Sequence, residues 1–229
     1  MDALPELTLY RLLSWLSPAY PVGAFSYSGG LEWAVEAGDL TSAGELQAWL
    51  TAVIRDGGGW CDALLFAHAH RAAAAGEAHA LSAIAELAAA LSPSRERHLE
   101  TTAQGRAFLD VTRAAWRCPA LDRLIAAWPG PYAYPVAVAV AAAGHGIPLT
   151  PALIAYLHAV DANLISAAVR LVPLGQTEGQ QVMARLASAI ADVAGRALAA
   201  GLDEIGSAAF RADLASMQHE TQYTRLFRS

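Results

Sequence analysis

The sequence predicts an all-α fold, a helical bundle of about ten helices in a single domain over residues 1–229. Apolar residues recur at helical spacing in nearly every segment, whereas the strict alternation typical of strands is almost absent. The composition agrees, because 53 of the 229 residues are alanine, the strongest helix former. No long linker, low-complexity stretch or obvious repeat divides the chain.

The first strongly periodic segment covers residues 46–54, where five apolar side chains fall at i, i+3, i+4, i+7 and i+8. Ser42 and Glu45 precede it at the spacing of a capping box. Three glycines at positions 57–59 are expected to end this helix. Apolar runs at 64–68 and 81–91 predict the next two helices.

Two later helices have proline-based start signals. Ser92-Pro93 and Thr150-Pro151 both look like an N-cap followed by proline at the first helical position, where the missing N–H costs nothing. From Thr150 a helical pattern runs to Pro173, and another follows with apolar residues from Val182 to Val193.

The 37 residues between Arg123 and Asp161 contain no charged side chain. A transmembrane helix needs about 20 consecutive apolar residues, but five prolines interrupt this stretch. Its longest smooth piece, residues 136–143, is expected to be a buried core helix. Weak valine–alanine alternation there would also suit a strand, although no partner strand is apparent. We therefore expect no membrane association.

Residues 17–32 break the helical regularity with two prolines, three glycines and two tyrosines, which indicates a structured turn. One interpretation is a simple helix connection whose Phe25 fills the core. The other is a rigid loop that presents Tyr27 and its neighbouring serines to a partner.

Residues 171–180 form a second irregular segment, broken by Pro173 and Gly175. Gln176 and Glu178 concentrate polar groups near the break. The segment is either a capped helix start, with Thr177 as N-cap and Gln180 three positions later, or a binding site.

The third irregular segment is the C-terminus, where we expect a docking tail over about residues 216–229. Chain ends often fray. This one combines aromatic and aliphatic side chains with arginines, a mixture typical of a segment that docks. Composition does not decide whether it docks on its own chain or on another.

The charge and cysteine content exclude several functions. The chain has no lysine, so it contains neither a Walker A phosphate loop nor a Schiff-base lysine. A net charge of −6 argues against nucleic acid or an anionic membrane as partner. Cys61 and Cys118 have no metal or redox spacing, and residues 1–6 show no signal peptide, so we expect a cytoplasmic protein.

The sequence shows no catalytic, cofactor or metal site, so we do not expect an enzyme. His68 and His70 point to different faces of a helix, and no nucleophile motif appears. The charge run at 94–100 is interpreted as a solvated helix face. A small all-α enzyme with a buried pocket would need polar groups converging from facing helices, and only scattered ones are visible.

Five segments, in order and correctly spaced over essentially the full chain, resemble the urease accessory protein UreF family. Residues 21–32 resemble its P-V-G-[GA]-F-S-Y-S-x-G-L-E motif, and 163–180 closely match its block ending in P-L-G-Q-T-[DE]-G-Q. Shorter likenesses are Ser94-Arg95-Glu96 with Gly105-Arg106, residues 134–137, and the ending that contains His-Glu and Arg-Leu-Phe. Gln218 departs from the family's usual arginine, which puts a tail–partner ion pair there in doubt.

The resemblance implies an all-α protein that tends to dimerise and has no catalysis of its own. It would join UreD (also called UreH) and the GTPase UreG on apo-urease and so support GTP-dependent nickel insertion. The alternative is a regulator of UreG that acts through an arginine, with Arg225 or Arg170 as candidates; the apolar neighbours of Arg170 favour a buried structural role. The predicted partner-binding residues are Tyr27, Ser26, Glu32, Gln176, Glu178, His219, Glu220, Tyr223, Arg225, Leu226 and Phe227.

Overall fold

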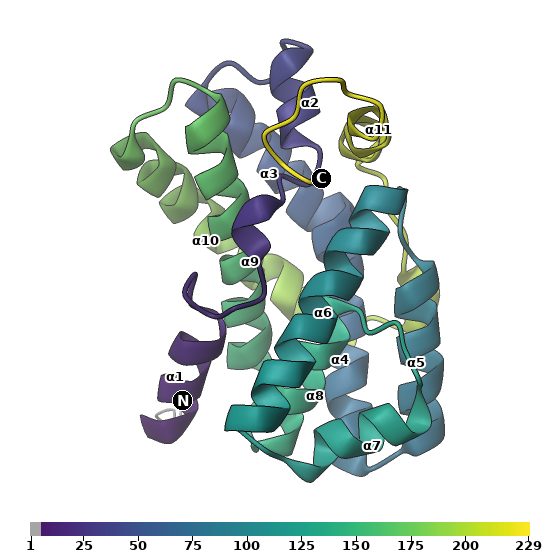
Figure 1. The fold of residues 1–229 in the computed structure, drawn as a ribbon. Coiled ribbons are helices and arrows are strands. Elements are labelled where there is room, and N and C mark those ends of the chain that lie inside the picture. The colour runs from purple at the N-terminus through teal and green to yellow at the C-terminus, as the bar shows by residue number, and fades with distance from the viewer. Residues whose placement is uncertain (1–5) are drawn as a thin grey trace.

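The computed structural model describes residues 6–229 and confirms the all-α prediction as a single helical domain (Figure 1). Within that range the chain forms no strand. The absence of a signal peptide was inferred from residues 1–6, of which 1–5 lie outside the described part. The α-helices are α1 (Glu6–Trp15), α2 (Leu31–Glu36), α3 (Ala43–Asp56), α4 (Gly58–Ala75), α5 (Ala78–Ala90), α6 (Arg95–Ala115), α7 (Pro119–Ala127), α8 (Tyr134–Gly144), α9 (Leu149–Leu171), α10 (Gln176–Ala199) and α11 (Phe210–His219), with 3-10 turns at Ala24–Ser26 and Leu202–Glu204.

Helix α8 is the centre of the core. Every residue from Tyr134 to Ala142 is buried, and the helix packs against α4, α6, α7 and α9. Its small alanine and valine side chains let neighbouring backbones approach closely. The core helix expected over 136–143 is therefore confirmed, and the alternative of a strand is wrong.

Helices α3, α9 and α10 form a second packed group beside this core, at the left of Figure 1. The four residues Val182, Leu186, Ile190 and Val193 on α10 are buried, as the helical spacing predicted. The N-cap of α3 is also confirmed, since the Ser42 hydroxyl accepts a hydrogen bond from the Glu45 amide at 3.3 Å. The other half of the predicted capping box differs, because the Glu45 carboxylate accepts from the Thr41 amide at 2.8 Å instead of from the Ser42 amide.

Both proline-based helix starts were placed two residues away from the true ones. Helix α6 begins after Ser94, whose hydroxyl accepts from the Arg97 amide at 3.1 Å, and not after Ser92. Helix α9 begins after Pro148, so Thr150 and Pro151 lie within its first turn. Proline fits any first-turn position because the amides there have no partner within the helix.

Helix α9 is the one described helix that is long and apolar enough to cross a membrane. Half of its apolar window is buried inside the fold, which is what a core helix of a soluble protein would show. The charge-free stretch noted in the sequence covers α8 and only part of α9. Length and composition alone do not identify a membrane span here, because buried core helices pass the same test.

Candidate partner-binding site

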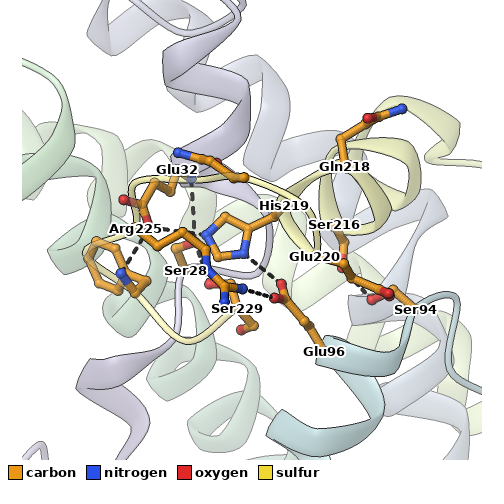
Figure 2. A network of polar contacts seen from close by, with 12 residues as sticks. Ser28, Glu32, Ser94, Glu96, Ser216, Gln218, His219, Glu220, Arg225 and Ser229 are labelled. Carbon is orange, nitrogen blue, oxygen red and sulfur yellow. Dashed lines mark hydrogen bonds and ion pairs between the residues drawn. The ribbon is translucent and has the colours of Figure 1, made fainter.

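The C-terminal segment after α11 turns back over α2 and ends beside α6, as the yellow trace in Figure 1 shows. His219, the last residue of α11, lies fully buried at the start of this path. Its Nδ1 is 2.6 Å from a Glu96 carboxylate oxygen and its Nε2 is 3.1 Å from Glu32 (Figure 2). One side chain thus joins α11 to both α6 and α2.

Two buried carboxyl groups contact the His219 ring, one at each nitrogen. An ionised carboxylate only accepts hydrogen bonds, so each contact needs a hydrogen on the ring nitrogen or on the carboxyl group. The Arg225 guanidinium donates to the other oxygen of Glu96 at 2.6 Å. Glu96 thus contacts both His219 and the Arg225 guanidinium, and hydrogen bonds to a charged group are stronger than neutral ones.

Glu32 also holds the backbone of the tail. Its two carboxylate oxygens accept from the amides of Leu226 at 2.5 Å and Phe227 at 2.9 Å. Three residues later, the Ser229 carbonyl accepts from the Ser28 hydroxyl at 2.5 Å and the Ser28 amide at 2.6 Å. The glycine-rich turn and the start of α2 therefore form the seat of the tail.

Helix α6 supplies the opposite wall, which corrects the interpretation of residues 94–100 as a solvated face. Glu96 and Glu100 are buried. Glu100 accepts from the Ser229 hydroxyl at 2.9 Å and from Arg97 at 2.5 Å. Ser94 shares a 2.5 Å hydrogen bond with Ser216, and the Arg95 amide donates to Glu220 at 2.8 Å, so the start of α6 also binds α11.

The outward face of the tail is apolar and basic. Tyr223 is fully exposed, Leu226 is 67% exposed, and Phe25 on the neighbouring turn is 69% exposed. Arg225 and Arg228 on the tail and Arg170 on α9 are exposed as well. We call the surface formed by these six residues the tail face. Exposed aromatic, aliphatic and arginine side chains together are typical of protein interfaces.

The structure reverses the expected roles of Phe25 and Tyr27. Phe25 does not fill the core, and its backbone carbonyl accepts from Arg170 at 2.9 Å. Tyr27 is buried, with the Arg228 guanidinium 5.7 Å from its ring centroid, and burial raises the pKa of its hydroxyl. Its neighbour Ser26 is partly buried and accepts from the Arg228 amide at 2.8 Å. In this structure Tyr27 supports the tail and is not itself presented.

Arg170 does not have the buried structural role that its apolar neighbours suggested. It is exposed, and its guanidinium lies 4.4 Å from the ring centroid of Phe227, which is itself buried. A cation–π contact of this kind contributes about 0.5–1 kcal/mol at exposed sites. Arg170 therefore joins α9 to both the turn and the tail.

Gln176 and Glu178 are exposed and lie at the start of α10. The N-cap is Gly175, not Thr177, and Glu178 accepts from the Gly175 amide at 2.9 Å. Helix α10 thus begins two residues earlier than the Thr177–Gln180 pairing predicted. Glu178 has a capping role, and within residues 6–229 no hydrogen bond or ion pair joins Gln176 or Glu178 to the tail.

Sequence reasoning missed five residues that hold the tail, namely Ser28, Ser94, Glu96, Glu100 and Ser216. A signal for two of them was available, because Glu96 and Glu100 lie at i and i+4 with Gln104 at i+8, on one face of α6, and all three are buried. Their partners come from more than 100 residues away in the sequence, so periodicity alone could not identify them. In residues 6–229 no three histidine, cysteine or acidic side chains gather closely enough to hold a metal ion.

Together these features define an all-helical protein whose best-organised polar site holds its own C-terminal segment and presents an apolar, basic surface. The comparisons with known proteins give the family. The UreF family model matches residues 40–187. A urease accessory protein UreF of Bradyrhizobium diazoefficiens is 62% identical over all of this chain and 95% of its own length.

Two further relatives agree. Urease accessory proteins UreF from two strains of Rhodopseudomonas palustris are 58% and 59% identical over the whole chain, which covers 95% and 96% of their lengths. The chain belongs to the UreF family of urease accessory proteins, and the resemblance inferred from the five sequence segments is confirmed.

Proposed function

We propose that this protein is a non-catalytic scaffold that joins UreD (UreH) and the GTPase UreG on apo-urease and so supports GTP-dependent nickel insertion. The observation that carries the proposal is the tail face, an apolar and basic surface fixed by a buried ion-pair network. A partner that supplies acidic and apolar groups would complement it. Because the chain has no lysine, a Walker A phosphate loop for GTP must come from another protein.

The rigidity of the tail supports this role. A segment that is already ordered does not lose that conformational entropy again on binding, so more of the contact energy appears as affinity. Tyr223, Arg225 and Leu226 are presented in this way, whereas His219, Glu32 and Phe227 are buried beneath them. The exposed side chains would contact the partner, and the buried side chains would hold the exposed ones in position.

The test is capture of UreG by the complex of UreD with this protein, with urease activation measured in parallel. Arg225→Ala and Leu226→Ala should reduce capture at least tenfold. Arg106→Ala is the matched control, because Arg106 is also an exposed arginine of this chain paired with one carboxylate, Asp110. Full capture and full activation by both tail variants would refute the assignment of this surface.

A second function, regulation of UreG turnover through an arginine, rests on the exposure of Arg225 and Arg170. An arginine finger must be free to reach the nucleotide, and in other systems it raises the rate 10³–10⁵-fold. Here Arg225 is held by Glu96 and Arg170 lies over Phe227. Measuring GTP hydrolysis by UreG with and without this protein separates the two functions: an unchanged rate favours the scaffold.

We also infer a cytoplasmic homodimer within this proposal. Leu7, Tyr10 and Leu13 lie on one face of α1 at three-residue spacing, and all three are exposed. Leu9 is exposed as well and lies next to Leu13 around the helix. These side chains are uncharged, and two copies of α1 packed antiparallel across a two-fold axis would pair Leu7 with Leu13. Light scattering on the isolated protein measures the resulting mass.

A further inference from the structure

Two cavities lie side by side within the helical body, with volumes of about 300 and 270 Å³. They share Asp62 of α4, together with Arg97 and Thr101 of α6. Tyr156 of α9 donates a 2.7 Å hydrogen bond to Asp62 from within the second cavity. Polar groups from facing helices therefore do converge, which corrects the expectation that they are only scattered.

Asp161 on α9 lines the larger cavity and has a buried carboxyl oxygen without a partner. The residue is 2% exposed, and its Oδ2 has no hydrogen-bond partner within residues 6–229. Unsatisfied buried polar groups are rare in folded proteins, because each costs about 1–3 kcal/mol. Such a group beside a cavity indicates that something polar occupies the space.

The neighbours of Asp161 do not neutralise it. Burial alone raises the pKa of the Asp161 carboxyl to about 8, with no contribution from a charged group. Around the same cavity lie Asp62 of α4, Arg97 of α6 and Asp213 of α11, but Arg97 is paired with Glu100 and Asp213 accepts from Ser207. The side of the cavity formed by Asp161 thus has no counter-charge of its own.

The rest of this cavity is mostly apolar. Its lining includes Leu31, Val53, Leu65 and Leu157, and Trp49 supplies the only aromatic ring. Ligand sites commonly combine such an apolar wall with a few fixed polar groups. An aromatic face also attracts organic cations.

We propose that the larger cavity is a binding site for a small protonated organic amine, whose ammonium group pairs with Asp161 and whose apolar body lies against the aliphatic wall. Since the chain contains no lysine, no ammonium side chain of its own can fill this place. Binding converts the neutral Asp161 carboxylic acid to a carboxylate. The released proton passes to the solvent, and the amine keeps its own.

The test is isothermal titration of the full-length protein with benzylamine at pH 7, in two buffers of different ionisation enthalpy. Benzyl alcohol, which has nearly the same shape without the charge, is the matched ligand control. We expect saturable binding of benzylamine with release of about one proton per ligand, and binding of benzyl alcohol at least tenfold weaker. The proton count needs no variant, so it remains decisive even if a substitution impairs folding.

Asp161→Asn provides the second arm, since it keeps the shape and removes the acid. It should weaken benzylamine at least tenfold and abolish proton release. Absence of saturable benzylamine binding up to about 10 mM would overturn the proposal. Equal affinities of the wild-type protein for benzylamine and benzyl alcohol would overturn the proposal too. Equal affinities of wild type and Asp161→Asn for benzylamine would also overturn it.

Discussion

At the scale of single residues, the tail depends on His219. Replacing it with alanine leaves the Glu32 and Glu96 carboxylates buried and facing only Arg225 and backbone amides. Removing one member of a buried ion pair costs roughly 3–5 kcal/mol. We expect the tail to detach locally, so that the amides of Leu226 and Phe227, which donate to Glu32, exchange hydrogen about 100-fold faster.

The neighbouring Gln218→Ala is the control for this measurement. Gln218 is exposed, and its side chain has no hydrogen bond in the structure. The same position departs from the family's usual arginine, and the network around His219 forms without it. If His219→Ala left the Leu226 and Phe227 amides as protected as Gln218→Ala does, the ion-pair network would not be what orders the tail.

Asp161 gives a prediction for stability against pH. Its carboxyl pKa is about 8 when folded, against an ordinary value of 3.8. Between these values the folded state holds a proton that the unfolded state has lost, so stability falls as pH rises from about 4 to about 8. Each unit of pKa difference corresponds to about 1.4 kcal/mol, which makes the effect on the order of a few kcal/mol at pH 7.

Asp161→Asn should therefore be more stable than wild type at pH 7 and lose most of this pH dependence. Urea unfolding at pH 5, 6, 7 and 8 measures the free energy of unfolding of both proteins. A residual slope below pH 6 is expected from Asp62, whose pKa is raised to about 6, chiefly by burial. Parallel stability curves for the two proteins would contradict the assignment to Asp161.

At the scale of elements, two helix caps differ in one respect. Ser42 and Ser94 have nearly the same N-cap backbone angles, and each accepts from an amide three residues on. Ser94 alone also bonds another helix, through Ser216 of α11. Ser42→Ala should cost about 1 kcal/mol, a typical loss for an N-cap. Ser94→Ala should cost about 1 kcal/mol more, because Ser216 then loses its buried partner.

Chemical denaturation of both variants and of Ser94→Ala with Ser216→Ala checks this difference. The double variant should cost less than the sum of its single changes, because both remove the same hydrogen bond. Equal losses for Ser42→Ala and Ser94→Ala would mean that the α6–α11 contact adds nothing to stability.

Two helical glycines differ in whether the neighbouring backbone leaves room for a side chain. A Cβ on Gly105 of α6 would overlap the backbone carbonyl of Tyr132, whereas a Cβ on Gly195 of α10 meets nothing within 4 Å. Gly195→Ala should stabilise by about 0.5–1 kcal/mol through helix propensity. Gly105→Ala should destabilise by more than about 1–3 kcal/mol, the usual cost of overpacking. Thermal unfolding of both variants decides between these signs.

The sequence predicts helices better than it predicts their starts or their partners. Periodicity located α9 and α10 because burial of one face repeats along a helix. The start of α6 was predicted at Ser92 because a serine followed by proline is itself a valid N-cap. The local sequence does not distinguish Ser92 from Ser94, and the packing of α6 selects Ser94. The tail site needed contacts between residues 32, 96 and 219, which no local pattern records. The motif in residues 21–32 marked the right segment but not that Tyr27 would be buried and Phe25 exposed.

At the scale of the whole molecule, burial is uneven, and this bears on assembly. The core around α8 is closed, whereas α1 lies at the edge of the body in Figure 1 and exposes the apolar side chains of Leu7, Leu9, Tyr10 and Leu13. Helix α11 also exposes Phe210 and Leu214. Exposed apolar stripes of this kind commonly mark interfaces. The proposed function assigns α1 to the contact with a second copy, whereas α11 leads directly into the tail.

Single charges placed in these stripes distinguish their roles. Leu13→Glu should dissociate the homodimer, because antiparallel pairing would bury an unpaired carboxylate against Leu7 of the second copy. Leu214→Glu, at a similarly exposed leucine, should leave the dimer intact. Light scattering should then give twice the 24.0 kDa chain mass for wild type and Leu214→Glu, and the single mass for Leu13→Glu.

A wild-type protein of single mass would remove the dimer from the proposed function but leave the tail face unaffected. Dissociation by Leu214→Glu alone would move the dimer contact from α1 to α11, next to the surface assigned to UreG.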